Sequence, residues 1–171
     1  MLAKKEEILI RAFEPGDTDD IVRLTVAEFE PASIDAKIEA MMGGTPWARV
    51  KEKVVRDELA AYPAGCFVAV TGGAVVGYVT TTLNLLASRG TVANLVVSSA
   101  CQGRGIGRKL LQRALQYFRA LNLQQAKIET LATNEVGQHL YPSLGFREVV
   151  RQIHYAMSLT GEVEGAAPKR K

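Results

Sequence analysis

Apolar residues recur at helical spacing over much of the N-terminal third of the chain. Residues 8–13 are mainly apolar and predict a first strand. Helical spacing then appears over residues 21–29, 34–42 and 47–59, with a Gly-Gly-Thr-Pro break at 43–46. This part of the chain therefore predicts one strand followed by three helical stretches.

A β-hairpin is predicted next, because two apolar runs flank a Gly-Gly turn. The runs are residues 66–70 and 74–83, and the turn is Gly72-Gly73. Residues 91–97 are rich in β-branched residues and end in Leu-Val-Val, which is typical of a buried strand. A hairpin and a third buried strand are thus expected in the middle of the chain.

The strongest amphipathic pattern covers residues 106–121, where an apolar face lies opposite a face of arginine, lysine and glutamine. This stretch predicts a long helix packed on a sheet. The remaining pattern predicts a strand, a short helix and two final strands, over residues 126–131, 135–144, 146–150 and 153–159.

This order of elements predicts an α/β (α+β) fold in which helices cover both faces of a mixed sheet, giving three layers, α/β/α. The strands at 91–97 and 126–131 are joined through a helix, so we expect them to be parallel, within a mostly antiparallel sheet. No repeat or long linker interrupts the pattern. Residues 1–160 are therefore expected to form a single domain, with residues 161–171 as a polar tail.

Composition narrows the classes of function. The 171 residues are 47% hydrophobic and carry a net charge of +3, which suits an anionic small ligand. No stripe of Lys and Arg with interleaved aromatics argues for nucleic acid, and no apolar run approaches the roughly 20 residues of a membrane span. Without a signal peptide, a cytoplasmic protein is expected. Neither a disulfide framework nor a metal site is expected, because ligand spacing is missing among Cys66, Cys101, His139 and His154.

The candidate chemistry lies in the glycine loop, residues 102–108, between the strand at 91–97 and the long helix. Its sequence is Gln-Gly-Arg-Gly-Ile-Gly-Arg. Glycines let the backbone turn tightly, and the first turn of a helix offers unpaired N–H donors and a positive dipole end. Arg104 and Arg108 add charge-assisted donors. The loop therefore predicts a pyrophosphate site, and the alternative is a turn that only connects strand to helix.

Two other phosphate-binding loops do not fit these residues. A Walker A loop ends in Gly-Lys-Ser/Thr, where this chain has Arg108-Lys109-Leu110. A dinucleotide-binding fingerprint needs its third glycine at Arg108 and several strand-helix-strand units, of which the pattern offers one. Both interpretations are therefore set aside.

The glycine loop resembles the acetyl-CoA motif of the GNAT superfamily of N-acetyltransferases. The signature Gln/Arg-x-x-Gly-x-Gly/Ala of that superfamily is matched by Gln102, Gly105 and Gly107. The resemblance covers about residues 6–159 and implies acetyl-CoA as co-substrate without a metal. A second motif matches, in order and at the family's spacing, at Asn134, Tyr141, Leu144, Gly145 and Phe146.

The resemblance also implies where acetyl-CoA binds. The pantetheine arm is expected to pair with the backbone of residues 95–97, in a gap where the two parallel strands splay apart. The loop amides are expected to hold the pyrophosphate, and Asn134 to contact the pantetheine. The implied cofactor-binding residues are Leu95, Val96, Val97, Gln102, Gly103, Arg104, Gly105, Ile106, Gly107, Arg108, Asn134 and Tyr141.

Acetyl transfer to an amine needs a base for the amine and an acid for the leaving thiolate. Tyr141, which the resemblance places near the sulfur, is the candidate acid, and the backbone N–H of Val97 is the candidate oxyanion donor. The candidate base is Glu129, within an otherwise apolar strand, five positions before Asn134, where ribosomal-protein alanine N-acetyltransferases carry a catalytic glutamate. Other relatives carry a glutamate at the position of Asn94, so a water relay stays open.

Each candidate has a plainer alternative. Tyr141 is otherwise a packed helix residue, and Glu129 a solvated residue paired with a cation. In the superfamily the acceptor is selected by segments that correspond to residues 28–62 and 84–90. An acidic rim or an ordinary solvated helix end is expected there from Glu28, Glu30 and Asp35.

The expected function is therefore that of an acetyl-CoA-dependent N-acetyltransferase. Its acceptor is a primary amine of a small molecule, a peptide N-terminus or a lysine, which attacks the thioester directly. The alternative is a non-catalytic acyl-CoA-binding sensor on the same fold. The resemblance also implies a homodimer.

Overall fold

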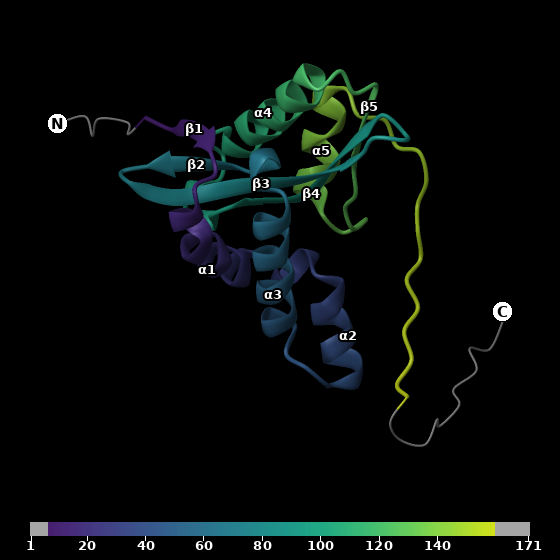
Figure 1. Ribbon diagram of the computed structural model, residues 1–171. Coiled ribbons are helices and arrows are strands. Elements are labelled where there is room, and N and C mark those ends of the chain that lie inside the picture. The colour runs from purple at the N-terminus through teal and green to yellow at the C-terminus, as the bar shows by residue number, and fades with distance from the viewer. Residues whose placement is uncertain (1–6, 160–171) are drawn as a thin grey trace.

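The computed structural model describes residues 7–159, which contain the sheet and the helices around it (Figure 1). The strands are β1 (Leu9–Ala12), β2 (Phe67–Thr71), β3 (Ala74–Asn84), β4 (Arg89–Val97) and β5 (Gln125–Ile128). The α-helices are α1 (Thr18–Glu28), α2 (Ile34–Met42), α3 (Trp47–Ala61), α4 (Ile106–Ala120) and α5 (Glu135–Leu140).

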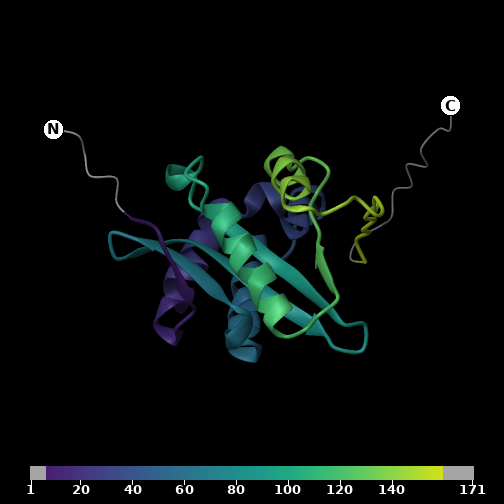
Figure 2. The same ribbon diagram turned by 90° about the horizontal axis from the view of Figure 1, so that it is seen from above.

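The strands form one mixed sheet in the order β1-β2-β3-β4-β5. The first three pairs are antiparallel, and β4 pairs with β5 in parallel through the α4 crossover. Figures 1 and 2 show α4 lying over one face of the sheet, with α1 and α3 on the other. The mixed three-layer fold and its parallel pair are thus as the sequence predicts.

Two hydrophobic clusters lie on opposite faces of this sheet. Successive side chains of β2 point to opposite faces and so contribute to both clusters. Phe67 packs into the cluster on the α4 side, and Val68 packs into the cluster on the side of α1 and α3. Leu110 and Leu111 of α4 are fully buried. The sheet is therefore covered on both faces, and the space left for a ligand lies at a strand edge.

A β-bulge interrupts β4 close to where β5 ends. Thr80 pairs with Asn94 but Thr81 pairs with Val92, so Ala93 has no partner on β3. One extra residue reverses the faces to which later side chains point. Accordingly, Val92 packs on the α4 side, whereas Val96 packs on the side of α1 and α3. The bulge therefore turns Asn94 toward α3.

The C-terminal part of the sequence prediction needs correction. Residues 146–150 and 153–159 are predicted as strands, but the structure assigns no strand there, and β5 ends at Ile128 rather than 131. A strand forms only where a neighbour completes its hydrogen bonds, and this segment runs away from the outer edge of β5 (Figure 1). It exposes large apolar side chains, namely Val149, Val150, Ile153, Tyr155, Met157 and Leu159.

Two further expectations concern the C-terminal tail and helices that could span a membrane. The polar tail predicted at 161–171 lies outside the described residues. Among residues 7–159, none of the helices combines the length and the apolar character that crossing a bilayer requires.

Candidate active site

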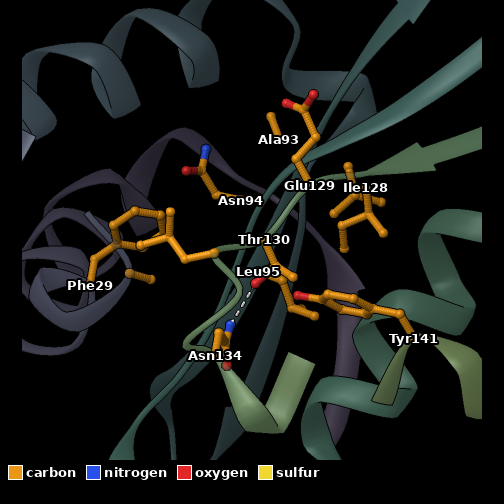
Figure 3. A pocket seen from close by; sticks show the side chains of 12 residues that line it. Phe29, Ala93, Asn94, Leu95, Ile128, Glu129, Thr130, Asn134 and Tyr141 are labelled. Carbon is orange, nitrogen blue, oxygen red and sulfur yellow. Dashed lines mark hydrogen bonds between the residues drawn. The ribbon is translucent and has the colours of Figure 1, made fainter. Parts of the chain in front are cut away.

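A small pocket of about 80 Å³ opens where β4 and β5 part (Figure 3). The parallel ladder ends at the Val92–Ile128 pair, so β4 beyond it has no β5 partner within the described residues. An open strand edge of this kind can pair with an extended ligand arm through main-chain hydrogen bonds. The pocket is lined by Phe29, Ala32, Val92, Ala93, Asn94, Leu95, Ile128, Glu129, Thr130, Leu131, Asn134 and Tyr141.

The glycine loop adopts a conformation that only glycine takes without strain. The φ angles of Gly103 and Gly105 are +73° and +76°, in the left-handed region. A Cβ at either residue would meet no atom within 4 Å, so the requirement is conformational rather than steric. Gly105 is the N-cap of α4, so the next three N–H groups have no intrahelical acceptor. The loop therefore presents bare donors at a helix N-terminus.

Side chains of the loop connect it to the end of β4 and to the segment that follows α5. Gln102 Nε2 donates to the Val97 carbonyl oxygen at 3.4 Å, which joins the loop to the end of β4. Arg108 Nη2 donates to Ser143 Oγ at 2.8 Å, beyond the end of α5. Basic side chains beside a helix N-terminus favour an anion. The loop thus has the chemistry that a diphosphate requires.

Asn134 and Tyr141 face the gap from the opposite side. Asn134 Oδ1 accepts from the Gly137 N–H at 3.1 Å, and its Nδ2 donates to Thr130 Oγ1 at 2.9 Å (Figure 3). The Tyr141 ring packs edge-on against Phe146, with centroids 6.2 Å apart. Burial raises the pKa of the Tyr141 hydroxyl, and Thr130 offsets part of this. The hydroxyl is therefore protonated at neutral pH and can act as a donor.

Gly137 and Thr130 belong to this group but escaped the sequence analysis. A Cβ on Gly137 would lie 2.9 Å from Tyr141 Cε2, 3.0 Å from Asn134 Nδ2 and 3.2 Å from Thr130 Oγ1. The three side chains thus close around a position without room for a methyl group. The spacing of Asn134 and Tyr141 was the only sequence signal nearby. It marks the residues that flank α5 and does not indicate that both pack against Gly137.

Gly137→Ala is expected to slow turnover roughly tenfold, because the added methyl displaces Asn134 and Tyr141 by overpacking. Alanine favours a helix over glycine by about 1 kcal/mol, so lost helix propensity cannot explain the defect. Steady-state kinetics checks it. The control is Gly16→Ala, where a Cβ meets nothing within 4 Å. Equal kinetics for the two variants would contradict the packing argument.

Glu129 lines the pocket but points away from Tyr141 (Figure 3). Its carboxylate lies 2.8 Å from Lys127 Nζ, and its side chain is 68% exposed. This is the solvated ion pair that the sequence leaves open as the alternative. The role of Glu129 as base stays a prediction.

The other candidates from the sequence do not line the pocket. Glu28, expected in an acidic rim, accepts from the Ser99 backbone N–H at 2.9 Å, and neither it nor Asp35 lines the pocket. Cys101 is half-buried, with Arg104 Nη1 3.9 Å from its sulfur. Across residues 7–159, no three His, Cys, Asp or Glu side chains are grouped to hold a metal ion.

Relatives of this chain are found among acetyltransferases. The family model described as the acetyltransferase (GNAT) family matches residues 22–146. An N-alpha-acetyltransferase of Sulfurisphaera tokodaii is 32% identical over 110 residues, covering 58% of this chain and 66% of the relative. The N-acetylaspartate synthetase of Rattus norvegicus is 32% identical over 96 residues, covering 56% and 32%. The matches thus span less than two thirds of these relatives' lengths.

The fold also has solved counterparts. The PaiA N-acetyltransferase from Thermoplasma acidophilum, solved in complex with coenzyme A, matches with a TM-score of 0.67 at 16% identity. The match covers 82% of this chain and 90% of that one. At this identity the likeness concerns the fold alone.

Proposed function

Because the chain belongs to the acetyltransferase (GNAT) family, we propose that it transfers an acetyl group from acetyl-CoA to a primary amine. The observation that carries this proposal is the joining of two features at one strand end. A gap opens between β4 and β5, and the glycine loop presents bare amides at the adjacent helix N-terminus. The gap can hold an extended ligand arm, and the loop amides can bind a diphosphate.

Acetyl-CoA is proposed to lie across this strand end. The amides from Gly103 to Arg108 and the two arginines of the loop bind the diphosphate. The pantetheine arm pairs with the β4 backbone at residues 95–97, and Asn134 binds it from the other side. This orientation brings the thioester toward the Tyr141 hydroxyl, and no metal takes part.

The proposed reaction is a direct transfer. The neutral amine attacks the thioester carbonyl carbon, the C–N bond forms, and the carbonyl oxygen becomes an oxyanion near the Val97 N–H. The C–S bond then breaks, the CoA thiolate takes a proton from Tyr141, and Tyr141 regains the proton that the nitrogen loses as the amide forms. A raised pKa keeps Tyr141 in the protonated form that this step requires.

The acceptor belongs to the class of primary amines: a small molecule, a peptide N-terminus or a lysine side chain. A cytoplasmic setting is also proposed, because Cys66 and Cys101 are both free thiols. Homodimerisation remains part of the proposal, since the exposed apolar residues between 149 and 159 offer surface that a second copy can cover. Sedimentation of the purified protein tests it.

The experiment that tests the function combines acetyl-CoA with a panel of amines and reads thiol release with a thiol reagent. We expect thiol release that depends on both the protein and an amine, with acetylated product confirmed by mass spectrometry. Binding of coenzyme A without turnover of any amine, unchanged in Tyr141→Phe, would instead indicate the sensor. Failure to bind coenzyme A would contradict both.

A further inference from the structure

A connected polar cluster lies on the α3 side of the pocket. Asn94 and Thr80 are 3% and 1% exposed. Lys51 Nζ donates to Asn94 Oδ1 at 2.7 Å, and Asn94 Nδ2 donates to Thr80 Oγ1 at 2.8 Å. Glu58 Oε2 accepts from Asn94 Nδ2 and, at 3.1 Å, from Thr80 Oγ1. The cluster therefore joins helix α3 to strands β3 and β4.

Asn94 is fixed in one orientation by its partners. A lysine ammonium only donates and a carboxylate only accepts, so Oδ1 must face Lys51 and Nδ2 must face Glu58. The bulge at Ala93 turns Asn94 to this face. Asn94 also lines the pocket. The cluster and the site of transfer thus share a side chain.

One carboxylate oxygen of Glu58 makes no hydrogen bond within the described residues. Within residues 7–159, both of its hydrogen bonds are made by Oε2. No buried side-chain oxygen in that range lacks a partner, so Oε1 must be in contact with solvent. Glu58 is thus anchored through one oxygen and open at the other.

Lys51 extends the cluster to a second wall of the pocket. Its Nζ lies 3.9 Å from the centroid of the Phe29 ring, which also lines the pocket. The Phe29 ring and the Asn94 amide therefore line the pocket on this side, and the Glu58 carboxylate lies one hydrogen bond behind the amide. Glu129, by contrast, is paired with Lys127.

Burial and neighbouring charges set the protonation of these groups. Burial raises the pKa of Glu58, and Lys51 lowers it in part. Burial lowers the pKa of Lys51, while Glu58 and Asp35 of α2 raise it. The other titratable groups near Glu58 are Tyr78 of β3 and Cys66 ahead of β2, whose pKa values are both raised, so both are neutral at pH 7.

We propose that Glu58 accepts the proton of the acceptor amine, and that Asn94 and Lys51 position it, a proposal that rests on the acetyl transfer described above. The protonated amine first gives one proton to Glu58 Oε1, directly or through a water. The neutral nitrogen then bonds to the carbonyl carbon, the C–S bond breaks, and the thiolate takes the proton of Tyr141. Tyr141 regains the proton that the nitrogen loses as the amide forms, and Glu58 releases its proton to solvent, so the net products are the amide, CoA and one proton.

Glu58→Gln tests this proposal in the full chain, with acetyl-CoA and an amine identified by the panel. At pH 7 we expect kcat/KM to fall about 10²-fold, because the amine loses its proton acceptor. The variant must then rely on the neutral fraction of the amine, which rises about tenfold per pH unit below the amine pKa. The defect should therefore shrink by about that factor per pH unit as the pH rises.

Three further variants make the result specific. Glu52→Gln, on the same helix and paired with Arg56 at 3.1 Å, should leave the rate and its pH profile unchanged. Glu129→Gln tests the other candidate base, and its defect should be smaller than that of Glu58→Gln and the same at every pH. Glu58→Asp retains a carboxylate, so it should keep the wild-type shape of the pH profile even if Glu58→Gln folds poorly. Calorimetry with coenzyme A and thermal unfolding check binding and folding in each.

Two outcomes would overturn the proposal. One is a Glu58→Gln defect of the same size at every pH, which indicates a structural role. The other is a pH-dependent defect in Glu129→Gln with Glu58→Gln near the wild type, which assigns the base to Glu129. In both cases the wild type still acetylates amines. Absence of turnover by the wild type with every amine counts instead against the acetyl transfer itself.

Discussion

Gly105→Glu is expected to weaken coenzyme A binding at least about 10³-fold, which corresponds to about 4 kcal/mol. Two effects act together. Gly105 has a φ of +76°, where a residue with a Cβ is strained by about 1–2 kcal/mol. The new carboxylate also lies beside the first amides of α4, where it competes with and repels the diphosphate. Isothermal titration calorimetry with coenzyme A measures the loss.

Matched variants separate strain from charge. Gly73 has a φ of +80° and open space around its Cβ position, but it lies in the β2–β3 turn. Gly73→Glu therefore imposes similar strain and the same charge, and coenzyme A affinity should stay within about threefold of wild type. Gly105→Asn, which tolerates the left-handed region and adds no charge, should lose much less affinity than Gly105→Glu. A loss below about tenfold in Gly105→Glu would place the diphosphate elsewhere.

The glycine loop could be identified from sequence because its determinants are local. The change from an apolar strand at 91–97 to an amphipathic helix at 106–121 locates the turn, and the glycines between them match positions of left-handed backbone. The parallel pair follows from the same segment, because a helix between two strands demands a crossover. These features need no knowledge of distant residues.

The strands predicted for the C-terminal segment show that an alternating apolar pattern is not sufficient to form a strand. Ile153, Tyr155 and Met157 occupy alternate positions, as residues on one face of a strand would, yet all three are exposed in the structure. Alternation describes where side chains would point if a partner strand were present. Pairing depends on the path of the chain after Gly145, which periodicity does not encode.

The cluster around Glu58 was invisible for a related reason. Glu58 and Asn94 are 36 positions apart, and nothing in the helical pattern of 47–59 distinguishes this glutamate from its neighbours. Asn94 faces it only because Ala93 adds a residue to β4. Site residues fixed by a bulge and by the packing of a helix on a sheet emerge only in three dimensions.

Tyr141→Phe is expected to lower kcat by about 10²–10³-fold while leaving the affinity for acetyl-CoA within about threefold of wild type. The substitution removes only the hydroxyl, and the edge-on packing of the ring against Phe146 is kept. Without that proton donor, the thiolate must leave as an anion or take its proton from water. Single-turnover kinetics with acetyl-CoA and the amine separates this chemical step from binding and product release.

The pH profile distinguishes this acid from a packing residue. An acid works only while protonated, and burial raises the pKa of Tyr141. Wild-type activity should therefore persist past the ordinary tyrosine pKa near 10 and fall only above it, and that decline should be missing in Tyr141→Phe. Tyr155→Phe, at a side chain that is 89% exposed, is the control and should behave as wild type. An unchanged kcat in Tyr141→Phe would remove this hydroxyl from the mechanism and leave the thiolate to be protonated by solvent.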